Sequence, residues 1–223
     1  MSARGEAPSR APRRSRAPAS AVRRARSDDA PAIHAIIHGF ASQDLLLPRP
    51  LADIYDRIRD FWVVEEGGRI VGCAALRIWW HDLGEVRSLA VAEEAAGRGH
   101  GAALVRTVEE EAARYGLRVA FALTRVEDFF ARQGYTVVDR AVLYQKVWGD
   151  CARCPKRYAC DEVAVVKALV PGAIDRLISP DPVALQRVEH VVPPRAPGMP
   201  ERLIHVAPRR RPGVAEPEPP AAR

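Results

Sequence analysis

A short stretch in the middle of the chain combines a carboxylate, a cation and a glycine-rich loop. Residues 86–105 read VRSLAVAEEAAGRGHGAALV, and Glu85 stands directly before them. Three glycines within residues 97–101 cost backbone entropy, so we expect a ligand to approach the backbone closely there. An apolar strand pattern precedes the glycines and a helical pattern comes after them. This order indicates an anion site, because the first N–H groups of a helix have no partner within the helix.

Two familiar phosphate-binding motifs do not fit this loop. Gly97-x-Gly99-x-x-Ala102 matches the loose dinucleotide pattern. That pattern requires the glycines at the end of the first strand and an acid about 20 residues further on. Here the strand after the loop ends in Leu123-Thr124-Arg125, without an acid. A mononucleotide P-loop is excluded, because the chain contains no Gly-Lys-Ser/Thr.

The elements that position the loop predict a mixed α/β sheet. Strands are expected at 21–25, 61–65, 69–80, 85–91, 117–124, 136–139 and 142–148, and helices at 27–42, 51–60, 102–116 and 127–134. The short connections within 61–91 force an antiparallel meander. The helix after the glycines then joins 85–91 to 117–124 in parallel, and this mixture argues against a doubly wound fold.

Charge and composition divide the chain into a core and two basic tails. Of the net charge of +6, residues 1–26 carry eight Arg and one Glu, and residues 195–223 carry six Arg and three acids. The segment between them is therefore net acidic, at −4, which argues against nucleic acid as a partner of the core. We expect a disordered basic tail at 1–20, a folded domain at 21–150, a Cys-containing extension at 151–172 and a largely disordered Pro/Arg-rich tail at 173–223.

Targeting signals are not recognisable in the sequence. No apolar run approaches the ~20 residues of a membrane-spanning helix. The chain also shows no signal-peptide apolar region, so we expect a cytoplasmic protein with reduced thiols.

The loop and its surroundings resemble the acetyl-CoA-dependent N-acetyltransferases of the GNAT superfamily. Their signature Q/R-x-x-G-x-G/A falls on residues 96–101, with Ala96 at the first position in place of Gln or Arg. The resemblance implies the GNAT fold and acetyl-CoA as co-substrate. It also implies a pyrophosphate held by the N–H groups of the loop, and the implied acetyl-CoA-binding residues are Leu89, Ala90, Val91, Arg98, Gly99, His100, Gly101, Ala102 and Phe130.

A narrower resemblance concerns the acceptor. The segments LLLPRP, DLGEVRSLAV, FFARQGY and YQKVWGDCARCPKRYACDE are similar to the short N-acetylglutamate synthases of bacterial arginine biosynthesis, which lack a kinase domain. The similarity covers about residues 21–170. It implies acetyl transfer to the α-amine of L-glutamate. Glutamine, another amino acid or a protein amine stays open as acceptor, and so does a basic-tailed nucleic-acid-binding or partner-binding protein. A homodimer is also left open.

Glutamate would bring two carboxylates, each requiring an Arg or Lys. The candidates are Arg49, Arg87, Arg125 and Lys146, although short synthases usually have Tyr at the position of Arg125. Glu85 is the candidate base for the α-ammonium group, directly or through water. A backbone N–H near Leu89 or Ala90, freed by a bulge, would stabilise the oxyanion.

Two further features leave alternatives open. Many relatives protonate the departing thiolate with a Tyr where this chain has Phe130, so water or Tyr144 would serve here. Cys151-x2-Cys154-x5-Cys160 resembles a metal knuckle, but it supplies three ligands and would need a fourth such as Asp161, His190 or water. We therefore predict reduced thiols and no metal. Cys73 is expected to be a small core residue.

Overall fold

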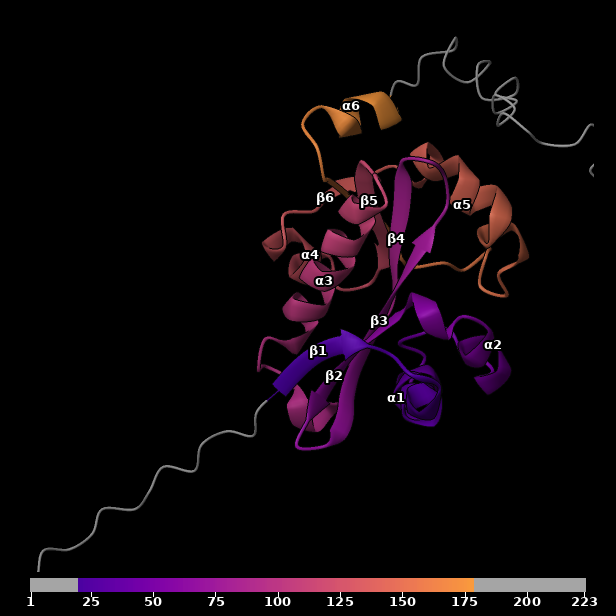
Figure 1. Ribbon diagram of the computed structural model, residues 1–223. Helices are drawn as coiled ribbons and strands as arrows, with labels where there is room; N and C mark the ends of the chain where they lie inside the picture. The colour runs from indigo at the N-terminus through magenta and orange to yellow at the C-terminus, as the bar shows by residue number, and fades with distance from the viewer. Residues whose placement is uncertain (1–19, 179–223) are drawn as a thin grey trace, which may run out of the picture. The chain divides into compact units, whose positions relative to one another are not determined.

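One seven-stranded sheet organises the molecule, in the order β1-β2-β3-β4-β5-β7-β6 (Figure 1). The computed structural model describes residues 20–178. The strands are β1 (Ser20–Arg24), β2 (Phe61–Glu66), β3 (Arg69–Ile78), β4 (Leu83–Val91), β5 (Val119–Thr124), β6 (Thr136–Val138) and β7 (Val163–Ala168). The helices are α1 (Ala30–Ser42), α2 (Leu51–Asp56), α3 (His100–Arg114), α4 (Glu127–Arg132), α5 (Tyr144–Gly149) and α6 (Ala173–Ile178). These elements confirm the mixed α/β class that the sequence predicts.

The pairing of the strands also agrees with the expected topology. β2, β3 and β4 form an antiparallel meander. α3 then carries the chain from β4 to β5, and these two strands form the parallel pair. Because a parallel pair needs a long crossover, α3 must start where β4 ends, and the glycine loop lies at that junction.

The expected strand at 142–148 is wrong, because this segment forms the helix α5. The last strand of the sheet is instead β7, which pairs with both β5 and β6. A run of six or seven residues with scattered apolar positions fits a short helix as well as a strand. β7 lies in the stretch expected to form a Cys-containing extension, and it completes the same sheet.

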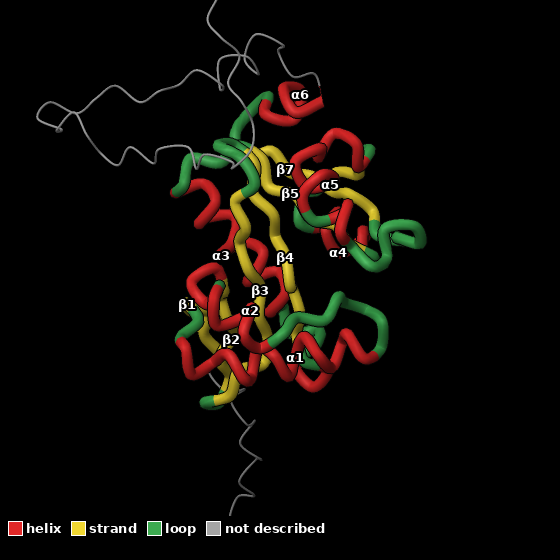
Figure 2. Tube along the Cα trace, turned by 90° about the vertical axis from the view of Figure 1, so that its right-hand side faces the viewer, coloured by secondary structure: helices red, strands yellow, loops and turns green. Residues whose placement is uncertain are grey.

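Helices cover both faces of the sheet (Figure 1). α3 packs Leu104, Val105 and Val108 against one face, in a cluster that includes Phe130 of α4. α1 and α2 cover the other face through the buried side chains of Ile33, Ile37 and Ile54. Figure 2 shows α1 and α2 in front of β2 and β3, with α5 in front of β5 and β7.

β4 and β5 remain paired only over their first three residues. The register runs from Leu83 opposite Val119 to Glu85 opposite Phe121, and it stops there. Beyond this point the two strands separate, so the backbone groups of residues 86–91 on the β5 side border a gap instead of a neighbouring strand. A sheet interrupted in this way offers a place for a ligand between two strands.

β4 also contains a bulge directly after its charged residues. Arg87 lies opposite Ala75 and Ala90 lies opposite Cys73, so two residues of β4 face Ala74 of β3. Ser88, the first of these two, has φ = +52°. This is the bulge that the sequence predicts near Leu89, and it reverses the alternation of side chains beyond it.

Some expectations fall wholly or partly outside the described residues. Most of the tail at 173–223 and the basic tail at 1–20 lie there, except for Ser20, which begins β1 and does not belong to a disordered tail. Residues 173–178 form α6, whose Ala173 packs into the apolar cluster around Leu83 and Phe121. Within residues 20–178 no helix is long and apolar enough to cross a membrane.

Two glycines allow a matched test of the backbone conformation: one lies within a helix and the other follows a helix. Gly39 lies exposed within α1 with no atom within 4 Å of an added Cβ. We expect Gly39→Ala to raise the free energy of unfolding by about 0.5–1 kcal/mol, because Ala loses less backbone entropy. Gly116 comes after α3 at φ = +75°. Gly116→Ala should lower the free energy of unfolding by about 1 kcal/mol, because an alanine is strained at this positive φ.

Urea denaturation at fixed pH measures both changes. Equal effects of the same sign would contradict the left-handed conformation of Gly116.

Candidate functional site

A cavity of about 1180 Å³ opens where β4 and β5 separate. Its walls come from β4, the end of β5, the segment 45–50, α5 and the segment 150–162. Nine cationic and four acidic side chains line it: Arg49, Arg57, Arg77, Arg87, Arg125, Arg140, Lys146, Arg153 and Arg157, against Asp53, Glu85, Asp150 and Glu162. This excess of positive charge favours an anionic ligand.

Glu85 lies at the bottom of this cavity, with both carboxylate oxygens occupied. Oε1 is 2.7 Å from Nζ of Lys146, and Oε2 accepts a hydrogen bond of 2.7 Å from Nε1 of Trp79. Glu85 is 4% exposed and Lys146 is 6% exposed. A buried carboxylate held by two donors in this way is fixed in direction.

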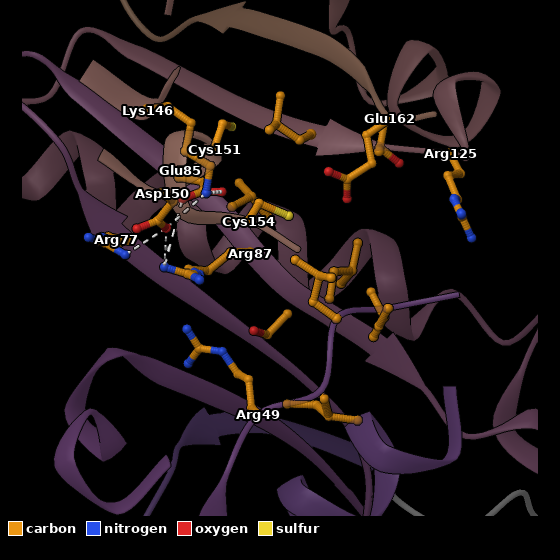
Figure 3. A pocket seen from close by; sticks show the side chains of 18 of the residues that line it. Arg49, Arg77, Glu85, Arg87, Arg125, Lys146, Asp150, Cys151, Cys154 and Glu162 are labelled. Atoms are coloured by element: carbon orange, nitrogen blue, oxygen red, sulfur yellow. Dashed lines mark hydrogen bonds and ion pairs between the residues drawn. The ribbon is translucent and has the colours of Figure 1, made fainter. Parts of the chain in front are cut away.

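Asp150 lies beside Glu85 and contacts three cationic side chains (Figure 3). Its Oδ2 lies 2.9 Å from Nη1 of Arg77, 3.1 Å from Nζ of Lys146 and 3.5 Å from Nη1 of Arg87. Burial alone would raise the pKa of Asp150, but Lys146 and then the two arginines outweigh it and lower the pKa below its ordinary value. Asp150 therefore stays charged and holds three cations together.

Arg49 and Arg87 point into the same space from opposite walls of the cavity (Figure 3). Their side chains are 10% and 20% exposed. Burial, followed by the charge of Arg87, lowers the pKa of Arg49. Arg49 is 3.2 Å from Asp53, whereas Nη1 of Arg87 is buried without a hydrogen-bond partner among the described residues. The space between these guanidinium groups lacks a compensating anion in the described part of the chain.

Arg125 lines the same cavity but lies apart from this cluster (Figure 3). Its guanidinium pairs with Asp161 and donates to the backbone oxygen of Asp44. Lys156 pairs with the Asp44 carboxylate as well. Arg125 thus connects the segment after α1 with the segment after the cysteines, and the four predicted substrate cations do not form one group.

The glycine loop has the conformation that its sequence requires. Gly97 and Gly99 have φ values of +74° and +83°, and Gly99 precedes the first residue of α3. A Cβ on Gly101 would lie 3.3 Å from the ring of Phe129. Within residues 20–178 no backbone oxygen accepts a hydrogen bond from the N–H groups of residues 98–102. Five free donors at a helix start form a site for an anion.

The other predicted cofactor residues divide into two groups. Leu89, Ala90, Val91, Gly101 and Phe130 line the cavity. The loop residues Arg98, Gly99, His100 and Ala102 lie outside its lining. Tyr144, considered as an acid for the thiolate, is also absent from the lining, as is every other tyrosine of the described residues.

The cysteines form part of the cavity wall. Cys151, Cys154 and Cys160 all line it, and their thiols are free. Burial raises the pKa of the Cys151 thiol. Cys73 is the core residue that the sequence predicts, and burial raises its pKa to about 12. Among residues 20–178 no group of three His, Cys, Asp or Glu side chains is placed to bind a metal ion.

Sequence reasoning missed three residues that organise the charges: Arg77, Trp79 and Asp150. Arg77 pairs in register with Glu85 across β3 and β4, so the predicted meander could have revealed it. Asp150 comes four residues after Lys146, a spacing that brings two side chains together on a helix. Assigning a strand to 142–148 concealed that contact. Trp79 carries no signal beyond its place at the end of β3.

Comparisons with known proteins point to one family. A family model described as "Acetyltransferase (GNAT) family" matches residues 23–135. An uncharacterized N-acetyltransferase of Chlorobaculum tepidum is 43% identical over 148 residues, which cover 66% of this chain and 96% of the relative. The amino-acid acetyltransferase of Mycobacterium tuberculosis is 37% identical over 135 residues, 59% of this chain and 77% of that protein.

A crystal structure of N-acetylglutamate synthase from Neisseria gonorrhoeae, complexed with coenzyme A and N-acetyl-glutamate, has the same fold as this chain. The TM-score is 0.60 at 27% identity, over 68% of this chain. The match covers 35% of the larger synthase chain.

The pairing of Lys146 with Glu85 can be tested by stability alone. We expect Lys146→Met to lower the free energy of unfolding by about 3 kcal/mol, because it leaves a buried carboxylate without its cation. The double variant Lys146→Met/Glu85→Gln should recover at least half of that loss. Urea denaturation at pH 7 measures both.

Arg114→Met is the matched control, since Arg114 is 3.6 Å from Glu110 and both side chains are exposed. We expect it to cost about 1 kcal/mol or less. Additive effects of the two changes in the double variant would show that Lys146 and Glu85 do not interact.

Proposed function

The chain belongs to the GNAT family of acetyltransferases, and from this premise we propose that it transfers the acetyl group of acetyl-CoA to the α-amine of L-glutamate. Its activity as an acetyl-CoA-dependent N-acetyltransferase follows from the family. The acceptor is our proposal. It is supported by the names of relatives such as the amino-acid acetyltransferase of Mycobacterium tuberculosis, and by the charges of the cavity.

The observation that carries the proposal is the pair of arginines around an empty volume beside Glu85. Arg49 and Arg87 approach this volume from two walls, and Lys146 lies at its base (Figure 3). Nη1 of Arg87 has no hydrogen-bond partner among the described residues, and Arg49 faces the same space. A substrate with two carboxylates can therefore bind both arginines in the bidentate geometry that Arg favours. Its α-amine then lies near Glu85, the buried carboxylate of the same cluster.

Glu85 has the role of accepting the proton that the α-ammonium group must lose, directly or through a water molecule. The amine nitrogen then attacks the thioester carbon, the C–S bond breaks and coenzyme A leaves. Backbone N–H groups at the Ser88–Leu89 bulge are placed to stabilise the oxyanion that forms. Water protonates the departing thiolate in this proposal, because Tyr144 lies away from the cavity.

The residues around the gap fit acetyl-CoA, which supplies the activated acetyl group. The free N–H groups of residues 98–102 suit its pyrophosphate, as the sequence resemblance implies. The apolar wall formed by Leu89, Val91 and Phe130 suits the pantetheine arm between β4 and β5. The pyrophosphate loop lies at one end of this wall and Glu85 at the other, so the two substrates meet at the bulge.

Glutamine is the alternative acceptor with the closest chemistry. It keeps the α-carboxylate and exchanges the second carboxylate for a neutral amide. One of the buried cations would then lose its anionic partner, so the site should prefer glutamate. A protein amine is less suited to this enclosed, charged cavity.

We also propose a cellular setting for the reaction. The resemblance to short N-acetylglutamate synthases suggests the first step of arginine biosynthesis. A cytoplasmic location is supported by the four cysteines of the chain, all unpaired in the structure. A homodimer remains a prediction.

An acceptor screen with acetyl-CoA tests the proposal directly. We expect glutamate to give the highest kcat/KM among the amino acids, with glutamine lower. Glu85→Gln should lower kcat by about 10²–10⁴-fold, because the base is lost. No acetylation of glutamate by the wild-type chain would overturn the assignment.

The cation assignments predict unequal effects on the KM for glutamate. Arg49→Gln and Arg87→Gln should each raise it by about 30-fold, because each leaves a substrate carboxylate unpaired. Arg125→Gln should change it by less than about threefold, because Asp161 and Asp44 already satisfy Arg125. Steady-state kinetics at saturating acetyl-CoA measure all three. A rise of about 30-fold in the KM for glutamate with Arg125→Gln would show that Arg125 binds a substrate carboxylate after all.

A further inference from the structure

A buried carboxylate contacts the glycine loop and does not line the cavity. Glu66 is the last residue of β2 and is 9% exposed. Its Oε1 accepts a hydrogen bond of 2.8 Å from Nη1 of Arg98, and Oε2 lies 3.0 Å from the same nitrogen. Nε2 of His100 is 3.6 Å from Oε2. One carboxylate thus contacts two of the five loop residues whose N–H groups are free.

Arg98 lies between Gly97 and Gly99, which both have positive φ. Because glycine has no Cβ, the backbone on either side of Arg98 can adopt many conformations. A second bond, from Nη2 of Arg98 to the backbone oxygen of Glu94, is 2.6 Å long. Both terminal nitrogens of the Arg98 guanidinium are therefore hydrogen-bonded.

The anchor itself is rigid. Glu66 ends a strand that is paired with β1 and β3, and the tight turn at Gly67-Gly68 comes directly after it. The sheet therefore determines where the Glu66 carboxylate lies. The carboxylate holds Arg98 by hydrogen bonds and lies beside His100, whose Nε2 has no hydrogen-bond partner among the described residues. Because the helix start at His100 moves with them, so do the N–H groups of residues 98–102.

We propose that Glu66 is a positioning residue for the pyrophosphate of acetyl-CoA, acting through Arg98 and His100 without touching the cofactor. This inference rests on the assignment of the pyrophosphate to the loop, and it holds for any acceptor amine. A positioning role and simple electrostatics predict opposite changes in coenzyme A affinity when the charge of Glu66 is removed. A negative charge near a pyrophosphate should repel it, so removing that charge should tighten binding. A positioning role requires that the same change weakens binding.

Glu66→Gln separates these two outcomes, because it keeps the size of the side chain and removes its charge. We expect the Kd of coenzyme A, measured by titration calorimetry without an acceptor, to rise about tenfold as the charged hydrogen bonds are lost. Unchanged or tighter binding would overturn the proposal. Since no acceptor is present, failure of glutamate as substrate would leave this result intact.

Glu109→Gln is the matched control. Glu109 is also a buried glutamate with a basic partner, Lys167 at 2.7 Å, but it lies on α3 more than two turns beyond the loop. We expect the Kd of coenzyme A for this variant to stay within about twofold of the wild-type value. A loss of about tenfold here as well would mean that any buried charge on this face of the sheet affects binding, and the proposal would fail.

Truncated acyl donors distinguish positioning from general damage to the protein. S-acetyl-dephospho-CoA retains the pyrophosphate, so Glu66→Gln should lower its kcat/KM about tenfold, with kcat nearly unchanged. S-acetylpantetheine lacks the pyrophosphate, so its kcat/KM should change by less than about twofold. Equal losses with both donors would indicate a merely structural role.

Arg98→Met keeps the test decisive if Glu66→Gln folds poorly, since Arg98 is half exposed. It should weaken coenzyme A binding to the same extent, about tenfold. The double variant should be no worse than either single variant, because both remove one interaction. Additive losses would show that Glu66 does not act through Arg98.

Discussion

The separation of β4 from β5 after Glu85 is the constraint on which the site depends. A strand inside a sheet normally satisfies its backbone groups on both sides. β4 keeps its second neighbour over only three residue pairs, the last of them Glu85 with Phe121. Residues 86–91 therefore border a gap, because β5 does not pair with their backbone groups. The bulge at Ser88 lies in this unpaired part, where a positive φ does not disturb a neighbour on the β5 side.

The bulge also explains why charges and apolar groups can share one short strand. Before it, Glu85 and Arg87 lie on the same face and Val86 packs toward α3. Beyond it, Leu89 and Val91 pack toward α3 instead, because one extra residue reverses the alternation. The charged end of the gap therefore passes directly into an apolar end. A regular strand would have placed Leu89 and Val91 on the same face as Glu85 and Arg87.

Sequence reasoning succeeded where a signal is local and failed where it depends on a distant partner. The glycine loop, the meander and Glu85 follow from spacing and turn chemistry, so the sheet order up to β5 could be predicted. The segment 142–148 has no strong periodicity, and its helical state depends on packing. There the aromatic ring of Trp79 lies against Gly149, with no room for a Cβ. With that helix missed, Asp150 could not be connected to Lys146, and the network of cations remained hidden.

Glu66 and Glu85 have the same physical role at two different places in the sheet. Each is a buried carboxylate that ends or begins a sheet pairing, and each holds cationic or N–H donors that would otherwise be mobile. Around Glu85 the donors are side chains, so part of their charge remains for a substrate anion. Around Glu66 the donor is Arg98, whose charge is neutralised by the carboxylate. The donors that remain free there are the backbone N–H groups of the loop. A substrate site can thereby discriminate by charge, whereas a cofactor site binds a pyrophosphate mainly through backbone geometry. The strands of the sheet fix the position of both carboxylates. A change at either carboxylate should therefore alter ligand affinity through the positions of the donors that it holds.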